Sequence, residues 1–406
     1  MRIATINSGS SSIKFSLYAM GPGETLMLSG NIAGIGSATG RFRVTSPDGT
    51  FRTEAEQKFR NHVEALNVVM AWLKARTEGG AVDAFGHRIV HGGSAYVEPC
   101  VVTPGFLAAL EELIPFAPDH LPHELAAIRE IARLYPDLPQ AACFDTAFHR
   151  TMPDVAQRYA LPGEIRRHGV LRYGFHGLSY EYILNELKTV AGPEAAYGRV
   201  IIAHLGNGAS MGAFRNGKST ETTMGFTPAG GLVMSTRSGD LDPGVIVYLL
   251  KEKGMDAYAL NRMVNKQSGL LGVSGISSDM KELLDREAKD PRAAAAVELF
   301  CYQAKKHLGA LAAVLGGLDT LIFTGGIGEN APPVRERICR GLEHLGIHTD
   351  KERNDLNEPI ISPESGPAAV RVMKTNEELM IARHTRGLID RTGGNHEQES
   401  HTRRDG

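Results

Sequence analysis

The sequence lacks an excess of charge of either sign. Lys and Arg total 44, Asp and Glu total 46, and the formal net charge is -2. A chain balanced in this way carries no electrostatic footprint for nucleic acid or for an anionic membrane. We therefore expect no nucleic-acid partner and no membrane partner, and any anion that binds must meet a local cluster of positive groups.

Cysteines and long apolar segments are also scarce. The four cysteines form no close pair with metal-ligand spacing and are too few for a disulfide framework. No apolar run approaches the ~20 residues that a membrane-spanning helix needs. The first residues alternate like a strand and do not resemble a signal peptide. These features predict a cytoplasmic protein.

The length of 406 residues exceeds what one hydrophobic core supports, since single cores stop growing at roughly 250–300 residues. Strand patterns alternate with helical periodicity, which predicts α/β layers. The expected strands are 3–6, 13–18, 85–90, 141–144, 200–204, 210–214 and 321–323. The expected helices are 63–74, 104–113, 124–134, 243–251, 293–315 and 377–388, and the polar residues 391–406 are expected to form a frayed tail.

One pattern occurs twice. A strand, a turn rich in Gly, Ser and Asn, and a second strand occur in ATINSGSSSIKFSL at the N-terminus and again in RVIIAHLGNGASMGAF after residue 200. We interpret the two as domains of the same basic design, the alternative being two unrelated hairpins. Small residues in such turns let backbone N–H groups approach an anion, so both turns are candidate phosphate sites. A third turn, FTGGIGEN, follows strand 321–323 and has room for a base or ribose.

Two other motifs are weaker. Gly212, Gly217, Lys218 and Ser219 match the spacing of a Walker A loop, but Asn216–Gly217 is a hairpin signal and a strand-like segment follows it. His120 and His123 have metal-ligand spacing, but no HExxH motif or cysteine cluster accompanies them. We therefore expect neither a P-loop nor a transition-metal site.

Taken together, many segments resemble the acetate kinase family. They occur in the family's order between residues 7 and about 383: NSGSSSIKF, HRIVHGG, FDTAFH, RYGFHGLS, HLGNGAS, TMGFTP, TRSGDLDP, SGLLGVSGISSDM, FTGGIGEN and TNEELMIAR. The resemblance implies two ribonuclease-H-like domains of the actin and sugar-kinase superfamily that enclose ATP. The expected boundaries are 1–148 plus about 378–406 for the N-terminal domain and 149–377 for a nucleotide-binding and dimerisation domain. The implied reaction is reversible phosphoryl transfer from ATP to acetate with Mg²⁺, or Mn²⁺ in its place, in a homodimer.

The resemblance also implies roles for particular residues. The active-site group is Asp145, His176, Arg237, Arg88 and His120, and the acetate pocket is Arg88, Val90, Phe175 and Pro228. The implied metal ligands are Asn7 and Glu377. The implied nucleotide-binding residues are Ser10, Ser12, Lys14, His204, Leu205, Gly206, Asn207, Gly208, Asp279, Met280, Lys281, Gly326, Ile327, Gly328, Glu329 and Asn330.

A carboxylate acceptor simplifies the expected chemistry. Acetate is already ionised at neutral pH, so no general base is required to activate it. We therefore expect Asp145 to orient a neighbouring group, and we favour direct in-line transfer over a phospho-enzyme.

The acyl specificity is the open part of this prediction. The family's APLHNP loop reads APDHLP here, so that Asp119 and Leu121 replace leucine and asparagine at the acetate pocket. The alternatives are a kinase for propionate or another short acid, and a non-catalytic ATP-binding sensor. A sensor is expected to lose Arg88, Asp145, His176 or Arg237, and this chain keeps all four.

Overall fold

The computed structural model describes residues 1–76 and 82–402, and the chain divides into two compact units. Unit 1 comprises Met1–Ala147 and the segment from Asn376 onward, and unit 2 comprises Phe148–Thr375.

Among the described residues, unit 1 contains an eight-stranded sheet in the order β5-β4-β3-β2-β1-β6-β8-β7. Its strands are β1 (Arg2–Ser8), β2 (Ser12–Met20), β3 (Glu24–Ala33), β4 (Gly40–Thr45), β5 (Arg52–Gln57), β6 (Ala84–Ile89), β7 (Cys100–Val101) and β8 (Gln140–Phe144). Its helices are α1 (His62–Arg76), α2 (Pro104–Glu112), α3 (Leu121–Leu134) and α16 (Glu377–Thr402).

Unit 2 contains, in its described part, a five-stranded sheet in the order β11-β10-β9-β12-β13. Its strands are β9 (Val200–Leu205), β10 (Ala209–Arg215), β11 (Lys218–Thr222), β12 (Thr320–Thr324) and β13 (Ala369–Val372). Its helices are α4 (Asp154–Gln157), α5 (Gly163–Arg167), α6 (Gly177–Ala191), α7 (Pro193–Tyr197), α8 (Pro243–Lys251), α9 (Ala257–Lys266), α10 (Gly269–Ser274), α11 (Met280–Arg286), α12 (Pro291–Leu315), α13 (Gly325–Asn330), α14 (Pro332–Cys339) and α15 (Lys351–Asp355).

The two sheets share one topology. Five strands of unit 1 lie in the order β3-β2-β1-β6-β8, and the unit 2 sheet has the order β11-β10-β9-β12-β13. In each, an antiparallel three-stranded meander leads into two parallel pairings, β1 with β6 with β8 and β9 with β12 with β13. The interpretation of the two turn motifs as corresponding parts of one repeated design is therefore confirmed.

Helices cover both faces of the unit 1 sheet. Phe85 of β6 packs in a core with residues of α1 and α3, whereas Gly86 points to the other face, as alternation along a strand requires. A Cβ at Gly86 would lie 2.3 Å from Thr385 Oγ1 and 2.6 Å from Ile381 Cγ2 of α16. Glycine at this position is what lets α16 approach the sheet so closely, and α16 brings Glu377 to the same sheet.

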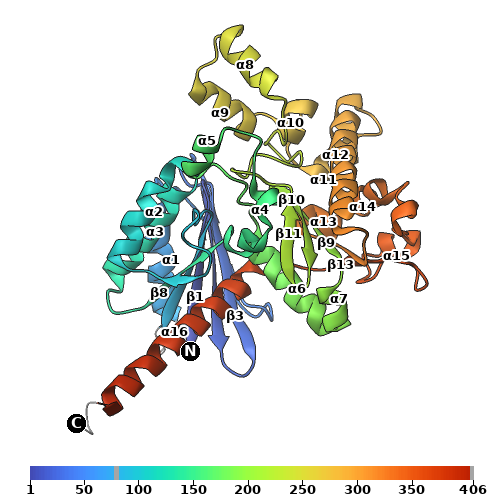
Figure 1. Ribbon diagram of the computed structural model, residues 1–406. Coiled ribbons are helices and arrows are strands. Elements are labelled where there is room, and N and C mark those ends of the chain that lie inside the picture. The colour runs from blue at the N-terminus through green and yellow to red at the C-terminus, as the bar shows by residue number, and fades with distance from the viewer. Residues whose placement is uncertain (77–81, 403–406) are drawn as a thin grey trace. The chain divides into compact units, whose positions relative to one another are not determined.

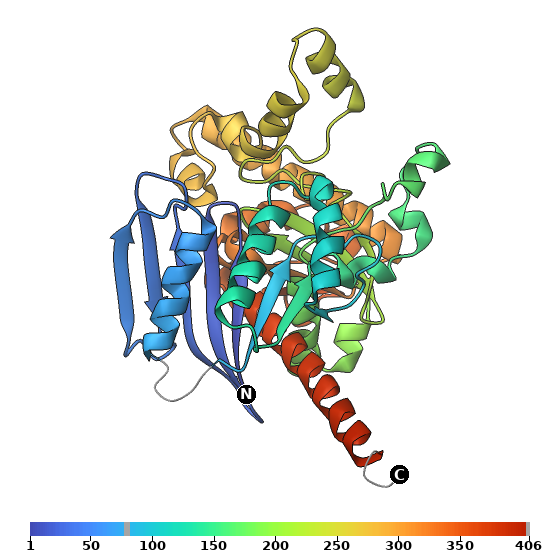
Figure 2. The ribbon, with the colours of Figure 1, turned by 90° about the vertical axis from the view of Figure 1, so that its left-hand side faces the viewer.

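Two local predictions have clear outcomes. Asn216 and Gly217 have φ values of 54° and 70°, as a tight hairpin turn of type I′ requires, and β10 and β11 flank them. The rejection of the Walker motif is confirmed. The expectation of a frayed tail is wrong as far as Thr402, because α16 continues to that residue; Glu397, Gln398 and Glu399 are good helix formers. Residues 403–406 lie outside the described residues. Figures 1 and 2 show the second half of α16 extending beyond the strands that its first half covers.

The described helices include none with the length and apolar character needed to cross a membrane.

Candidate active site

Arg88 is the centre of a charged cluster in unit 1. It lies near the end of β6, and its side chain is 15% exposed. Its Nε donates to Asp145 Oδ1 at 3.0 Å, its Nη2 donates to Asp145 Oδ2, and its Nη1 donates to Asn7 Oδ1 at 3.3 Å. Glu377 Oε2 lies 3.9 Å from Nε. Four residues that the sequence predicted are thus brought together by the ends of β1, β6 and β8 and by the start of α16.

Acidic groups outnumber basic groups in this cluster. Burial disfavours the charge of Arg88, but Asp145, Glu377 and Glu124 more than offset that effect and raise the pKa of Arg88. Burial also raises the pKa of Glu377 to about 7, because Arg88 offsets the loss of solvation only in part while Asp145 and Glu378 add repulsion. An additional positive charge would therefore be stabilised in this cluster.

The N-terminal turn predicted to bind phosphate lies between β1 and β2. Gly9 N–H donates to Ser12 O at 2.9 Å, which closes the turn, and Ser10 is exposed. Lys14 pairs in register with Asn7 and lowers the pKa of Glu377, so its ammonium group acts on the Arg88 cluster. His62 of α1 donates from Nε2 to Gly9 O at 2.6 Å and anchors the turn, a contact that no pattern in the sequence predicted.

Glu124 is the charged residue of the cluster that sequence reasoning missed. It is 1% exposed, and both of its carboxyl oxygens accept from Val90 N–H, at 3.1 and 3.2 Å. The signal was present in the sequence. Glu124 falls on the apolar stripe of α3, between Leu121 and Ile128 at helical spacing, where a carboxylate is out of place.

The other residues of the APDHLP loop lie at the start of α3. His120 is the residue before α3, and its carbonyl oxygen accepts from Glu124 N–H at 3.2 Å. Leu121 is fully buried, while Asp119 is half-buried and raises the pKa of His123 against the effect of burial. His123 stacks on His62 with ring centroids 4.0 Å apart. Within residues 1–76 and 82–402, no group of three or more His, Cys, Asp or Glu side chains is arranged to hold a metal ion.

Two glycine turns meet in unit 2. β9 and β12 are parallel neighbours, with Thr324 opposite His204, and each strand ends in a glycine-rich segment. A Cβ on Gly206 would lie 3.8 Å from Gly326 N, and one on Gly325, which has φ 77°, would lie 2.7 Å from Leu205 O. The carboxyl ends of parallel strands are where α/β proteins bind ligands. At Gly325 both the positive φ and the contact with Leu205 O require glycine, whereas at Gly206 a side chain would make only ordinary contacts.

His176 has an unusual backbone conformation. Its φ of 61° is left-handed, which costs a residue with a side chain roughly 1–2 kcal/mol, and it directly precedes α6. Its ring is fixed by Ser210 Oγ at 2.9 Å from Nδ1 and by stacking on His204 at 4.3 Å. A strained backbone conformation that is held in place by several surrounding contacts is typical of a functional site.

His176 and Arg237 converge on Gly208. A Cβ on Gly208 would lie 3.3 Å from His176 Nε2 and 3.4 Å from Arg237 Nη1. Arg237 Nη1 also donates to Pro228 O at 3.3 Å. Two side-chain nitrogens beside a glycine turn, one of them from a guanidinium, are an arrangement that suits an anion with several oxygens.

Several of the remaining predicted residues of unit 2 hydrogen-bond to neighbouring parts of the same unit. Phe175 is 1% exposed, and its carbonyl oxygen accepts from His149 Nε2 at 3.0 Å. Glu329 Oε1 accepts from Gly325 N–H at 3.0 Å, and Asn330 donates to Gly326 O. The other such residues are Met280, which is buried, Asp279, which caps α11, Lys281, which is exposed, Ile327, which is half-buried, and Gly328, which is buried.

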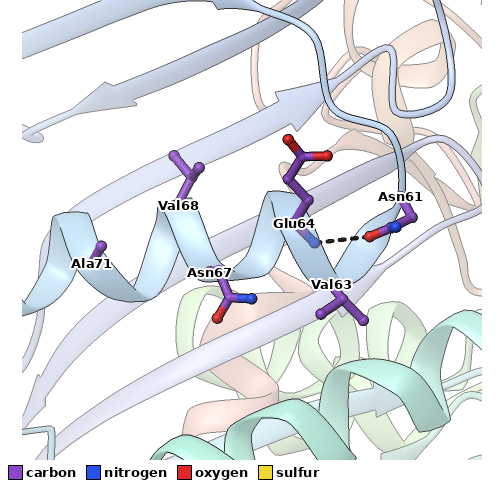
Figure 3. A pocket seen from close by; sticks show the side chains of 6 residues that line it. All are labelled: Asn61, Val63, Glu64, Asn67, Val68 and Ala71. Atoms are coloured by element: carbon purple, nitrogen blue, oxygen red, sulfur yellow. Dashed lines mark hydrogen bonds between the residues drawn. The ribbon is translucent and has the colours of Figure 1, made fainter.

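A hollow of about 510 Å³ lies along α1, lined by Asn61, Val63, Glu64, Asn67, Val68 and Ala71 (Figure 3). None of the predicted site residues lines it, and we assign it no part in the chemistry.

Fold and site together define an α/β protein of two similar units, with a largely buried arginine among carboxylates in one unit and glycine turns beside His176 and Arg237 in the other. The chain belongs to the acetokinase family, whose model matches residues 2–383. It is 47% identical over 395 residues to the acetate kinase of Rhodopseudomonas palustris, covering 96% of this chain and 98% of the relative.

Solved structures agree. The crystal structure of Porphyromonas gingivalis acetate kinase matches with a TM-score of 0.86 at 39% identity, covering 96% of this chain and 99% of that one. A propionate kinase from Francisella tularensis matches with a TM-score of 0.89 at 35% identity, covering 95% and 99%. The expected class of two actin-like α/β units is confirmed.

Acid sensitivity follows from His149, which is fully buried under Phe175. Burial lowers its pKa to about 4 and the charge of Arg150 adds to the effect, against the hydrogen bond that Nε2–H donates to Phe175 O; in the neutral ring Nδ1 accepts from Ser219 Oγ. The unfolded chain takes up a proton near pH 6.5 and the folded chain does not. Stability is therefore complete above about pH 6.5 and is lost towards about pH 4, by up to about 3 kcal/mol. We therefore expect the free energy of unfolding, measured with denaturant between these pH values, to decrease less steeply for His149→Gln than for the natural protein. His168→Gln at an exposed site serves as the control, and equal slopes for all three proteins would contradict the assignment.

Proposed function

We propose that the protein transfers the γ-phosphoryl group of ATP to acetate, reversibly, giving ADP and acetyl phosphate. The observation that carries the proposal is the convergence of His176 Nε2 and Arg237 Nη1 on Gly208. A phosphoryl group in transit spreads negative charge over three oxygens, so its transfer depends on positioning and on positive groups of this kind. Membership of the acetokinase family and the names of the relatives support the same reaction.

Arg88 binds the carboxylate of the acid in this proposal. A guanidinium matches a carboxylate in two parallel hydrogen bonds, and Asp145 holds Arg88 in place from the other side. Asp145 is thus occupied in orienting Arg88, and the ionised acid attacks phosphorus without a general base. Direct in-line transfer follows, with the acid's carboxylate oxygen forming the new bond as the oxygen of ADP leaves with the electron pair.

The nucleotide lies in unit 2 in this proposal. The segments at 204–208 and 326–330 meet at the ends of β9 and β12, and their glycines leave the backbone open to phosphate and ribose. The segment at 279–281 adds the first turn of α11. Lys14, Ser10 and Ser12 contribute from the N-terminal turn.

The residues present fit a magnesium ion. Mg²⁺ prefers oxygen ligands and usually takes one or two carboxylates together with phosphate oxygens. Asn7 Oδ1 and Glu377 Oε2 both lie beside Arg88, in a cluster with more acidic than basic groups. These two residues would hold the ion, which neutralises charge on the phosphates; Mn²⁺ has the same ligand preference.

A kinase for propionate or another short acid is the second candidate. The likeness to the Francisella tularensis propionate kinase supports it, and so does Asp119, a carboxylate at the predicted pocket. A non-catalytic sensor has less support, because Arg88, Asp145, His176 and Arg237 are all present.

We also propose that the protein is a cytoplasmic homodimer. α8 is mostly apolar, yet none of its residues is buried, and Val247 and Tyr248 are each 49% exposed. Figures 1 and 2 show α8 and α9 projecting from the rest of unit 2. An apolar helix in this setting is typical of a subunit interface, and the resemblance to acetate kinases makes a second copy its expected occupant. None of the four cysteines forms a disulfide within the described part of the chain, as is usual in a reducing compartment.

The reaction is tested by offering acetate, propionate, butyrate and glycolate in parallel to the protein with MgATP and hydroxylamine. Hydroxylamine traps an acyl phosphate as a hydroxamate, so the signal reports product directly. We expect acetate to give the strongest signal and longer chains progressively less. Preference for propionate or glycolate would change the proposed substrate but leave the proposed phosphoryl transfer in place. Absence of product from every acid, with ATP still bound, would favour the sensor.

Arg237→Ala tests the anion site. We expect kcat to fall by roughly 10³-fold with little change in KM for ATP, because Arg237 acts on charge that develops in the transition state. Steady-state kinetics with an unchanged circular dichroism spectrum are the measurement. A fall of less than roughly tenfold would make Arg237 a structural residue.

Tyr248→Glu tests the dimer. A charge on α8 should convert a species of twice the chain mass to one of single mass in sedimentation equilibrium, because a buried unpaired carboxylate opposes association. Val155→Glu, at a residue 79% exposed outside α8 and α9, is the control. If the natural protein itself sediments as a species of single chain mass, the homodimer proposal is contradicted.

A further inference from the structure

Glu124 has too few partners for a buried carboxylate. Among the described residues its sole hydrogen-bond donor is Val90 N–H, which both oxygens share, and the side chain is 1% exposed. An ionised carboxylate offers about four acceptor positions, and burying its charge without pairing is costly. Its environment therefore favours the neutral acid.

The charges around Glu124 lead to the same conclusion. Arg88 of β6 attracts an ionised Glu124, and Asp145 beyond β8 repels it. Arg88 is already shared with Asp145 and Glu377. If Glu124 were also ionised, three carboxylates would compete for one guanidinium before any substrate arrived. An incoming carboxylate would then meet net negative charge.

We propose that Glu124 carries a proton when the acid binds, and that this proton leaves the positive charge of Arg88 available to the substrate's carboxylate. Glu124 is thus a positioning residue that sets the affinity for carboxylate substrates. The inference rests on the proposed function in assigning Arg88 to the acid. Its physical core, the protonation of Glu124, does not depend on that assignment.

The pKa shift of Glu124 agrees with this geometry. Burial raises its pKa to about 8, with Arg88 and the Val90 N–H bond opposing the rise and Asp145 adding to it. The proton is therefore held below about pH 8 and lost above it. Losing it adds a negative charge beside Arg88, so the affinity for a carboxylate should fall as the pH rises.

The histidines near α3 do not change their protonation state between about pH 7 and about pH 9. His62 of α1 and His123 of α3 have pKa values lowered by burial, as has His87 of β6, whose pKa is about 4. All three are neutral from about pH 6.5 upward. Glu377 acts on Arg88, and Lys14 lowers the pKa of Glu377. Both residues are present in every variant compared, so their contribution cancels in the comparison.

The variant Glu124→Gln distinguishes an effect of the Glu124 proton from a structural role of the side chain. Glutamine keeps an oxygen to accept from Val90 N–H and cannot ionise. For the natural protein we expect KM for acetate to rise roughly tenfold between about pH 7 and about pH 9, as one added charge implies, with kcat and KM for ATP nearly constant. For Glu124→Gln we expect KM for acetate to equal the natural value at the lower pH and to rise with pH by clearly less than in the natural protein, because only the titration of Glu377, present in both proteins, remains. A merely structural Glu124 would leave the pH profile of the variant parallel to that of the natural protein, which would overturn the proposal.

Glu130→Gln is the matched control. Glu130 lies on the same helix, 8% exposed, and pairs with Arg133, which lowers its pKa, so it is ionised throughout. Removing this charge should leave the pH profile of KM unchanged. A flattened profile in Glu130→Gln as well would show that any charge on α3 suffices and would overturn the role of Glu124.

A second measurement needs no activity. Infrared difference spectra between the same two pH values should contain the C=O stretch of one buried protonated carboxyl that is missing from Glu124→Gln. The free energy of unfolding should decrease with rising pH less steeply in the variant, because a raised carboxyl pKa gives stability that is full below about pH 4.5 and lost through about pH 8. If no acid gives product while the band is present, the proposed function fails and the protonation stands. If the band is absent from the natural protein, the inference fails whatever the activity.

Discussion

The ion pair between Arg88 and Asp145 is the interaction on which the unit 1 site depends. Asp145 is 1% exposed, so the pair has little solvent to compensate a misplaced charge. β6 and β8 are parallel neighbours, with Arg88 opposite Cys143, and this register sets the two side chains at adjacent strand ends. Asn7 comes from β1 on the other side of β6, and Glu377 is delivered by α16, which the missing side chain of Gly86 lets approach. Sheet topology and one glycine therefore determine the charge arrangement.

Unit 2 uses the same topology for a different purpose. The strand corresponding to β6 in its sheet is β12, and its end carries a glycine turn where β6 carries Arg88 and Val90. The corresponding hairpins, β1–β2 and β9–β10, both turn through small residues. One scaffold thus presents charged side chains in one copy and bare backbone in the other. That division suits a reaction in which one reactant is a small carboxylate and the other is a phosphate chain.

Much of this could be predicted from the sequence, because the signals were local. The Asn216–Gly217 turn follows from its two residue types, and the helix at 243–251 was predicted with the bounds that the structure shows. Glu124 was missed because its importance lies in what α3 packs against: periodicity marks it as buried, but only the register of β6 shows that Val90 N–H and Arg88 are its neighbours. The continuation of α16 was missed because a polar composition does not distinguish an exposed helix from an unstructured tail.

The same packing explains why the site can combine an acidic cluster with an anionic substrate. Carboxylates hold Arg88 in place, and a fixed guanidinium loses less entropy on binding than a free one. Too many ionised carboxylates, however, would cancel the charge that the substrate needs. Burial resolves the conflict, because it favours the neutral form of those carboxyls that are not directly paired. Asp145 accepts two hydrogen bonds from Arg88, whereas Glu124 accepts none from it. The depth at which α3 buries Glu124 is therefore part of the chemistry of Arg88, even though the two side chains share no hydrogen bond.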